Sequence, residues 1–115
     1  MNITQKIQGD ILVLSIKGNL IGEPDASELR SAVYNVLEKG ARKVIVDLAG
    51  LKVINSMGLG VLIGSLTSMR KRGGDMTFAG PNDKVEGVLL LTQLVKVVKI
   101  YDTVERAVKG FRTGR

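Results

Sequence analysis

Runs of apolar residues predict the strands of this chain, and their length and composition separate buried from exposed ones. The run Ile11–Gly18 is mostly apolar and rich in β-branched residues, which indicates a buried strand, and Lys43–Leu48 is apolar on both faces. A weaker strand over residues 2–8 leads into the turn Gly9–Asp10, so we expect the first two strands to form a hairpin. Two later strands are predicted over Met76–Gly80 and Val97–Asp102.

Apolar residues at helical spacing predict four helices. The first follows the loop NLIGEPDA, has Pro24 in its first turn and is closed by Gly40. The third opens at the capping box Asp83–Glu86 and runs to about Leu94. The second helix ends at Gly73–Gly74, and its apolar face consists of Leu59, Leu62, Ile63, Leu66 and Met69. The apolar face of the fourth helix consists of Val104, Ala107, Val108 and Phe111.

The resulting order β-β-α-β-α-β-α-β-α predicts an α/β fold. Because a strand–helix–strand order with a strand as apolar as Lys43–Leu48 favours parallel pairing, we expect a central mixed sheet of four to five strands with about four helices. A chain of 115 residues has the length of one domain, so residues 1–115 are predicted to form a single domain.

Charge and composition narrow the classes of partner. The chain has 17 Lys and Arg against 11 Asp and Glu, a net charge of +6, which raises the question of nucleic acid. With aromatic residues at only 3%, a stacking surface for single strands is poorly supplied, so no direct nucleic-acid contact is expected. A solvated basic surface, or one that meets an acidic partner, explains the charge more simply.

The predicted location is the cytoplasm. There is no cysteine, which fits a reducing compartment. The N-terminal residues lack the charged start and long apolar middle of a signal peptide, and no apolar run approaches about 18 residues, so we expect no membrane insertion.

Ser56 is the residue whose chemistry needs explaining, because it stands where a loop becomes a helix. A serine there can simply be the N-cap, worth about 0.5–2 kcal/mol. A catalytic serine needs a base, and the chain contains no histidine and no S-x-x-K following Ser56. Without His or Cys a metal cluster is also not expected, so the sequence predicts neither an enzyme nor a cofactor.

The glycines after Ser56 read G-x-G-x-x-x-G at Gly58, Gly60 and Gly64, which is a poor match to a dinucleotide-binding loop. Seven residues separate Ser56, which precedes these glycines, from the end of the predicted strand at Leu48, and no acid ends the next strand. Gly60 and Gly64 are one turn apart, so close packing of the helix on the sheet is the simpler interpretation.

A regulatory use of Ser56 fits the same position. The first turn of a helix offers free N–H groups and the positive end of the dipole, so a phosphate is tolerated there. A phosphoserine adds about −1.5 to −2 charge at pH 7. Beside an apolar docking surface that includes Met57 and Leu59, this charge would prevent a partner from binding while the fold survives.

At these residues the chain resembles the STAS domain family, typified by bacterial anti-sigma factor antagonists. The stretch VIVDLAGLKVINSMGLGVLIGSL is similar to the family pattern D-L-S-x-L, a short spacer, then D-S-S/T-G-L-G-x-L. GNLIG corresponds to the family's opening G-x-L-D segment, and VKVVKIYDTVERAVKGF to its final strand and helix. The resemblance covers nearly the whole chain and implies a single STAS-like domain.

The resemblance implies a protein–protein switch. The unphosphorylated antagonist binds an anti-sigma factor and frees a sigma factor; the anti-sigma factor is also a serine kinase that phosphorylates the first serine of the motif, here Ser56, and a serine phosphatase reverses this. ATP belongs to the kinase. The resemblance implies that the following residues of this chain contact the partner: Asn19, Leu20, Ile21, Asn55, Met57, Gly58 and Leu59.

The chain departs from the family pattern at three positions. Asn55 stands in place of the acid before the serine, Ile21 in place of an acid in the early loop, and Met57 in place of a second Ser or Thr. Met57 leaves one candidate phosphorylation site and adds an apolar contact. The alternative function is a constitutive STAS scaffold in a signalling or lipid-transport assembly, in which Ser56 would only be a cap.

Overall fold

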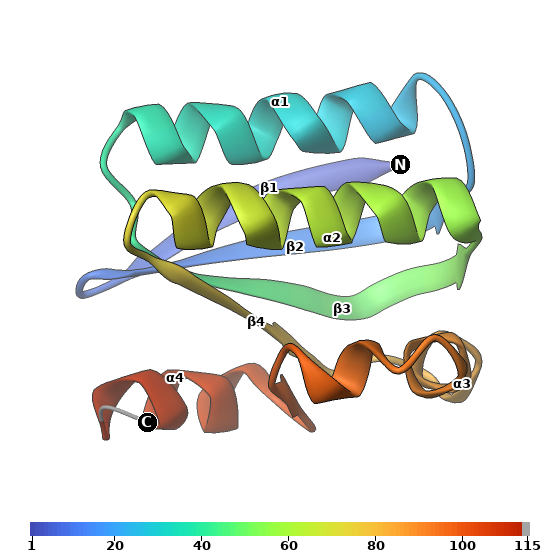
Figure 1. Cartoon of the computed structure of the whole chain (residues 1–115). Coiled ribbons are helices and arrows are strands. Elements are labelled where there is room, and N and C mark those ends of the chain that lie inside the picture. Colours follow the sequence, from blue (N-terminus) through green and yellow to red (C-terminus); the bar gives the residue numbers. More distant parts are fainter. Residues whose placement is uncertain (114–115) are drawn as a thin grey trace.

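The chain folds into a five-stranded mixed sheet with helices on both faces (Figure 1), and the computed structural model describes residues 1–113 of it. The predicted order of elements is confirmed, as is the α/β class. The elements are β1 (Asn2–Gln8), β2 (Ile11–Leu20), α1 (Asp25–Glu38), β3 (Lys43–Ile54), α2 (Ser56–Lys71), β4 (Asp75–Ala79), α3 (Asp83–Leu91), the 3-10 turn η1 (Leu94–Lys96), β5 (Ile100–Tyr101) and α4 (Val104–Arg112).

The strands lie in the order β1-β2-β3-β4-β5. β1 pairs antiparallel with β2, which confirms the predicted hairpin, while β2 to β5 are parallel to one another. The central strand β3 is covered on both faces, which is why Val44, Ile45 and Val46 are all buried. The carboxyl ends of β2, β3, β4 and β5 therefore meet at one edge of the sheet.

Two hydrophobic cores lie on opposite faces of the sheet. α1 and α2 cover one face, and α4 covers the other (Figure 1). The larger core includes Leu29 of α1, Leu62 of α2 and Phe78 of β4, all fully buried, and α3 closes its end. The smaller core packs Ile45 of β3 against Ala107 of α4. This double cover makes the sheet a rigid base for the loops at its carboxyl edge.

Strands β2 and β3 extend further than the sequence predicts. The apolar runs indicate ends at Gly18 and Leu48, but β2 continues to Leu20 and β3 to Ile54. The extra residues pair with each other, Asn19 opposite Val53 and Leu20 opposite Ile54. Register shifts between the two strands disturb the alternation of buried and exposed residues, and this hides the strand in the sequence.

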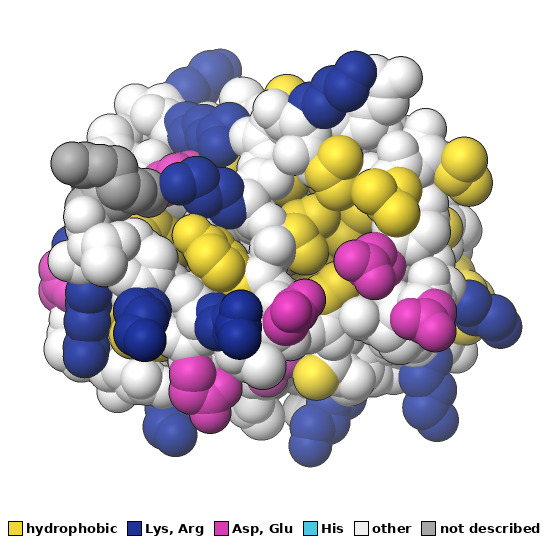
Figure 2. Space-filling view, turned by 90° about the horizontal axis from the view of Figure 1, so that it is seen from below, with side chains coloured by type: hydrophobic (Ala, Val, Ile, Leu, Met, Phe, Trp, Pro, Cys, Tyr) yellow, Lys and Arg dark blue, Asp and Glu magenta, His cyan; other side chains and the backbone are white. Residues whose placement is uncertain are grey.

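The segment after β4 also differs from the prediction. The leucine-rich helix ends at Leu91 rather than near Leu94, because Gln93 adopts a left-handed conformation with φ of 61° before η1 begins. The last strand is reduced to Ile100–Tyr101. Four large apolar side chains here remain exposed: Leu90, Leu91, Val95 and Val97. Figure 2 shows that hydrophobic side chains gather on the side of the molecule where α3 and α4 lie.

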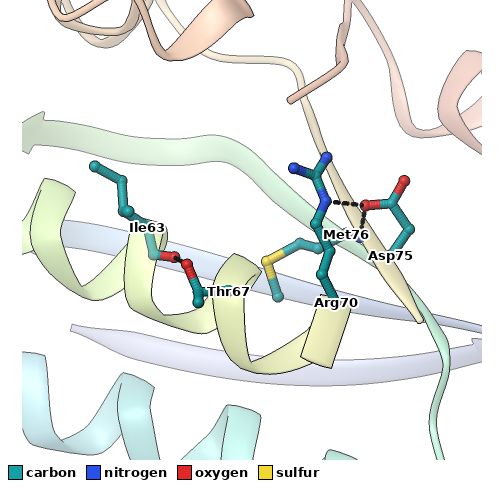
Figure 3. Close-up of polar contacts among 5 residues, drawn as sticks. All are labelled: Ile63, Thr67, Arg70, Asp75 and Met76. Carbon is teal, nitrogen blue, oxygen red and sulfur yellow. Dashed lines mark hydrogen bonds and ion pairs between the residues drawn. The ribbon is translucent and has the colours of Figure 1, made fainter. Parts of the chain in front are cut away.

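The predicted apolar face of α2 is confirmed except at one position. Leu59, Leu62, Leu66 and Met69 are buried, but Ile63 is exposed, and its carbonyl accepts a hydrogen bond from the Thr67 hydroxyl at 3.0 Å (Figure 3).

An ion pair holds the far end of α2 to the sheet. Arg70 Nε lies 3.0 Å from Asp75 Oδ1 at the start of β4, and the same oxygen accepts the Met76 N–H at 2.9 Å (Figure 3).

The glycine that packs tightly against the sheet is Gly58, and the expectation that Gly60 and Gly64 form this contact is wrong. A Cβ at Gly58 would lie 2.8 Å from Leu20 Cγ and 2.9 Å from Ile54 Cγ1, and it would also meet the Leu20 carbonyl oxygen. A Cβ at Gly60 or Gly64 would have no neighbour within 4 Å. The first turn of α2 therefore touches the end of β2, whereas the next two turns leave open space.

Gly58→Ala is expected to destabilise the protein by about 1–3 kcal/mol, because backbone and two core side chains must move to admit the methyl group. Gly60→Ala is the matched control, and it should be neutral or stabilise by up to about 1 kcal/mol through helix propensity. Urea unfolding of both variants measures the difference. Equal shifts for the two would contradict the close contact at Gly58.

Candidate functional site

Ser56 is the first residue of α2 and follows the carboxyl end of β3 after a single intervening residue. Its side chain is exposed, and its hydroxyl makes no hydrogen bond to any of residues 1–113. The serine is thus available to an approaching protein.

The residue that caps α2 is Asn55, so the prediction of Ser56 as the N-cap is wrong. Asn55 has an extended backbone, and its Oδ1 accepts the Gly58 N–H at 3.0 Å. α3 shows the same offset, because Asn82 rather than Asp83 is the cap and accepts the Val85 N–H at 2.8 Å. Asparagine is as good an N-cap as serine or aspartate, so the sequence offers two adjacent N-cap candidates at the start of each of these helices.

Asn55 also joins α2 to the loop after β2. Its Nδ2 donates to the Ile21 carbonyl at 2.7 Å, and its backbone N–H donates to the Leu20 carbonyl at 3.4 Å. The side chain thus uses both ends of the amide, one as acceptor and one as donor. An ionised aspartate at this position could cap the helix but could not donate to Ile21.

Exposed residues around Ser56 form one continuous surface at the ends of β2 and β3. Ile21 is 48% exposed and Met57 47% exposed, and Asn55 links their segments. Val53, 39% exposed, lies opposite Asn19 in the sheet and was missed because its segment was taken for a loop. We call this surface the docking face, and it consists of Asn19, Ile21, Val53, Asn55, Ser56 and Met57.

Three residues expected to contact the partner are buried instead. Leu20 belongs to the larger core, Gly58 is covered by the end of β2, and Leu59 packs inward from the first turn of α2. Their role is to position the docking face. The sequence motif names these residues together with the exposed ones, because it cannot separate the two faces of a strand end and a helix start.

The first turn of α2 differs electrostatically from those of the other helices. α1, α3 and α4 carry acidic residues in their first turns, and α2 carries none. The loop after β2 does contain an acid, Glu23, but its carboxylate accepts from Ser27 at 2.8 Å. This hydrogen bond from the Ser27 hydroxyl is the main cause that lowers the pKa of Glu23 below its ordinary value.

Other chemistries are poorly supported in the described part of the chain. Within residues 1–113 no three Asp or Glu side chains gather as a metal site would require. No helix in this region has the length and apolar character needed to cross a bilayer.

The spacing objection to a dinucleotide-binding loop is wrong, because β3 ends one residue before α2. The next strand still ends at Ala79 without an acid, and the Gly58 N–H is already bonded to Asn55.

Comparison with known proteins identifies the family of the chain. A family model described as the STAS domain matches residues 2–107. The chain belongs to the STAS domain family. The family resemblance predicted from the sequence is thereby confirmed.

Relatives of this STAS chain share a common description. A candidate anti-sigma factor antagonist from Thermotoga maritima is 37% identical over 108 residues, which is 93% of this chain and 95% of the relative. The anti-sigma F factor antagonist of Paenibacillus polymyxa is 31% identical over 92 residues, 80% of this chain and 79% of the relative. A crystal structure of a candidate antagonist from Thermotoga maritima has a TM-score of 0.87 at 34% identity, covering 96% of this chain and 94% of the other.

Asn55→Ala is expected to lower the free energy of unfolding by about 2 kcal/mol, because it removes both the cap and the bond to Ile21. Asn55→Asp keeps the cap and should cost about 1 kcal/mol. Hydrogen exchange should accelerate in residues 19–26 in both variants, but at the start of α2 only in the alanine variant. Identical exchange of the aspartate variant and the wild type would show that the link to Ile21 contributes nothing.

Proposed function

We propose that this protein is an anti-sigma factor antagonist that is inactivated by phosphorylation of Ser56. The unphosphorylated docking face binds an anti-sigma factor and so releases a sigma factor. The anti-sigma factor, acting as a serine kinase, modifies Ser56, and a serine phosphatase removes the phosphate. The names of the relatives support the general role, and the exposed serine on the docking face is the observation that carries the switch.

The docking face combines the properties that a charge-controlled contact needs. Ile21, Val53 and Met57 supply apolar area that a partner would cover, and Ser56 lies among them. Covering a neutral hydroxyl requires one hydrogen bond, whereas covering a phosphate without a counter-charge carries a desolvation penalty of several kcal/mol. Phosphorylation would therefore oppose binding at the centre of the contact.

The fold would tolerate this added charge. The phosphate would stand at the positive end of the α2 dipole, and no acid of the first turn of α2 would repel it. The side chain of Ser56 contributes no hydrogen bond within residues 1–113, so its modification breaks none. Because Ser56 is exposed at the start of α2, the added charge would weaken the binding of the partner and leave the fold of the domain intact.

The chain's own contribution to the transfer is a single nucleophilic oxygen. Ser56 Oγ would attack the γ-phosphorus of ATP held by the kinase, the bond to the bridging oxygen would break, and ADP would leave. The hydroxyl proton passes to a base of the kinase, because the first turn of α2 has no acidic residue and the chain has no histidine. The proposal assigns no catalytic step to the STAS protein itself.

Incubation with ATP and anti-sigma factor kinases from the same bacterium should add the mass of one phosphoryl group to the wild type. Ser56→Ala should gain none, and Ser31→Ala, which removes an exposed serine of α1, is the control that should gain as much as the wild type. Intact mass spectrometry measures both.

The affinity of Ser56→Asp is measured with ADP-loaded kinase, which cannot phosphorylate either protein. Ser56→Asp should bind this kinase at least about tenfold more weakly than the wild type, because the substitution places one charge in an apolar contact. Equal affinities of Ser56→Asp and the wild type for the kinase would contradict the phosphorylation switch. If a partner binds firmly but no kinase modifies the chain, the constitutive scaffold is the correct function.

A further inference from the structure

A groove lies between α1 and α2 and is lined by residues of both helices. It has a volume of about 530 Å³. Its walls are residues one turn apart on each helix, from Arg30 to Leu37 on α1 and from Gly60 to Arg72 on α2. At 1.5 Å rise per residue, the α2 wall is about 18 Å long. The groove is therefore an elongated channel along two straight helices rather than a closed cavity.

Gly60 and Gly64 of α2 line this groove, and the packing of the described residues does not require glycine at either position. Glycine disfavours a helix relative to alanine, and a Cβ at Gly60 or Gly64 would meet nothing within 4 Å. The space in front of them is open, in contrast to the crowded Gly58. Small residues of this kind are useful when a second backbone approaches the helix closely.

Ser65 also lines the groove and is 6% exposed. It adds one hydroxyl to walls that also include the apolar side chains of Val33, Leu37 and Val61. The inner part of the groove is therefore mainly apolar, as the contact surface for an amphipathic helix should be.

The rim of the groove is basic and carries an aromatic side chain. Arg30, Lys71 and Arg72 line it, and no acidic residue does. Arg30 and Arg72 make exposed ion pairs with Glu23 and Glu38, which are weak and can be exchanged for a partner's carboxylates. Tyr34 is 57% exposed and stacks beneath Arg72, with 6.0 Å between the guanidinium carbon and the ring centre.

The groove begins one turn after Ser56. Ser56, Gly60, Gly64 and Ser68 follow one another at intervals of four residues and form a ridge of small side chains along α2. A partner helix with its own ridge at this spacing could pack into such a surface. The surface is continuous with the docking face and ends among the basic residues.

We infer that this groove holds an amphipathic helix of the anti-sigma factor, with small or apolar residues over Gly60 and Gly64 and acidic residues facing the basic rim. The inference rests on the proposed function for the identity of the partner and extends its contact from the docking face along α2. The helix packs on the apolar side chains of the groove and covers Tyr34.

The test compares the affinity of purified, ADP-loaded anti-sigma factor kinase for two matched variants by calorimetry. Gly64→Leu fills the groove and should weaken binding about tenfold or more, while Gly87→Leu, at an open position of α3, should stay within about twofold. Both should keep or raise the melting temperature, by up to about 4 °C, because leucine favours a helix over glycine. A weaker affinity with a higher melting temperature cannot result from misfolding.

A label reports the occupant directly. The chain has no cysteine, so Ser68→Cys gives a single site for a nitroxide, which the kinase should immobilise. Lys71→Glu should weaken binding at least about threefold at low salt, with a smaller effect at high salt.

Each other outcome decides against the inference. If Gly64→Leu binds like the wild type while Ser56→Asp binds weakly, the proposed function stands and the groove does not take part. If no anti-sigma factor kinase binds the wild type, both proposals are wrong. If Gly64→Leu instead abolishes self-association in sedimentation and leaves kinase binding intact, the groove belongs to a second copy of the chain.

Discussion

The carbonyl of Leu20 and the glycine that lies against it fix the start of α2 on the end of β2. Leu20 is the last residue of its strand, its carbonyl accepts the Asn55 N–H, and only the absence of a Cβ at Gly58 allows the helix to begin there. Every property of the docking face depends on this approach. It turns Ser56 and Met57 outward, and it brings Ile21 within reach of the Asn55 amide.

Asn55 changes what the departure from the family motif means. An acid before the serine would add negative charge to the site. The Asn55 amide instead accepts a hydrogen bond from the Gly58 N–H with its oxygen and donates one to the Ile21 carbonyl with its nitrogen. The chain thus gains a rigid link between two parts of the docking face and leaves the first turn of α2 without any negative charge. A phosphate on Ser56 would be the first charge there, which favours a large contrast between the two states of the switch.

The three glycines of α2 look alike in the sequence and have different physical roles. Gly58 is required by the chain's own packing, because backbone and core side chains occupy the position of its Cβ. Gly60 and Gly64 face open space beside a basic rim, so the packing of the described residues does not require them. Spacing within a motif cannot distinguish these cases, since all three are glycines that follow one another after two and four positions on one helix.

The sequence by itself determined the order of elements, the hairpin, the parallel pairing and the family, because apolar periodicity and turn residues are local properties. It also grouped Ser56, Asn55, Met57 and Ile21, which are exposed in the structure, and Asn55 is hydrogen-bonded to Ile21. Only the tertiary structure decided that Leu20 and Leu59 are buried, that Val53 is exposed, and that β3 reaches Ile54. These outcomes depend on the register of β2 against β3 and on which side of α2 meets the sheet, and both are set by contacts between residues more than 30 positions apart.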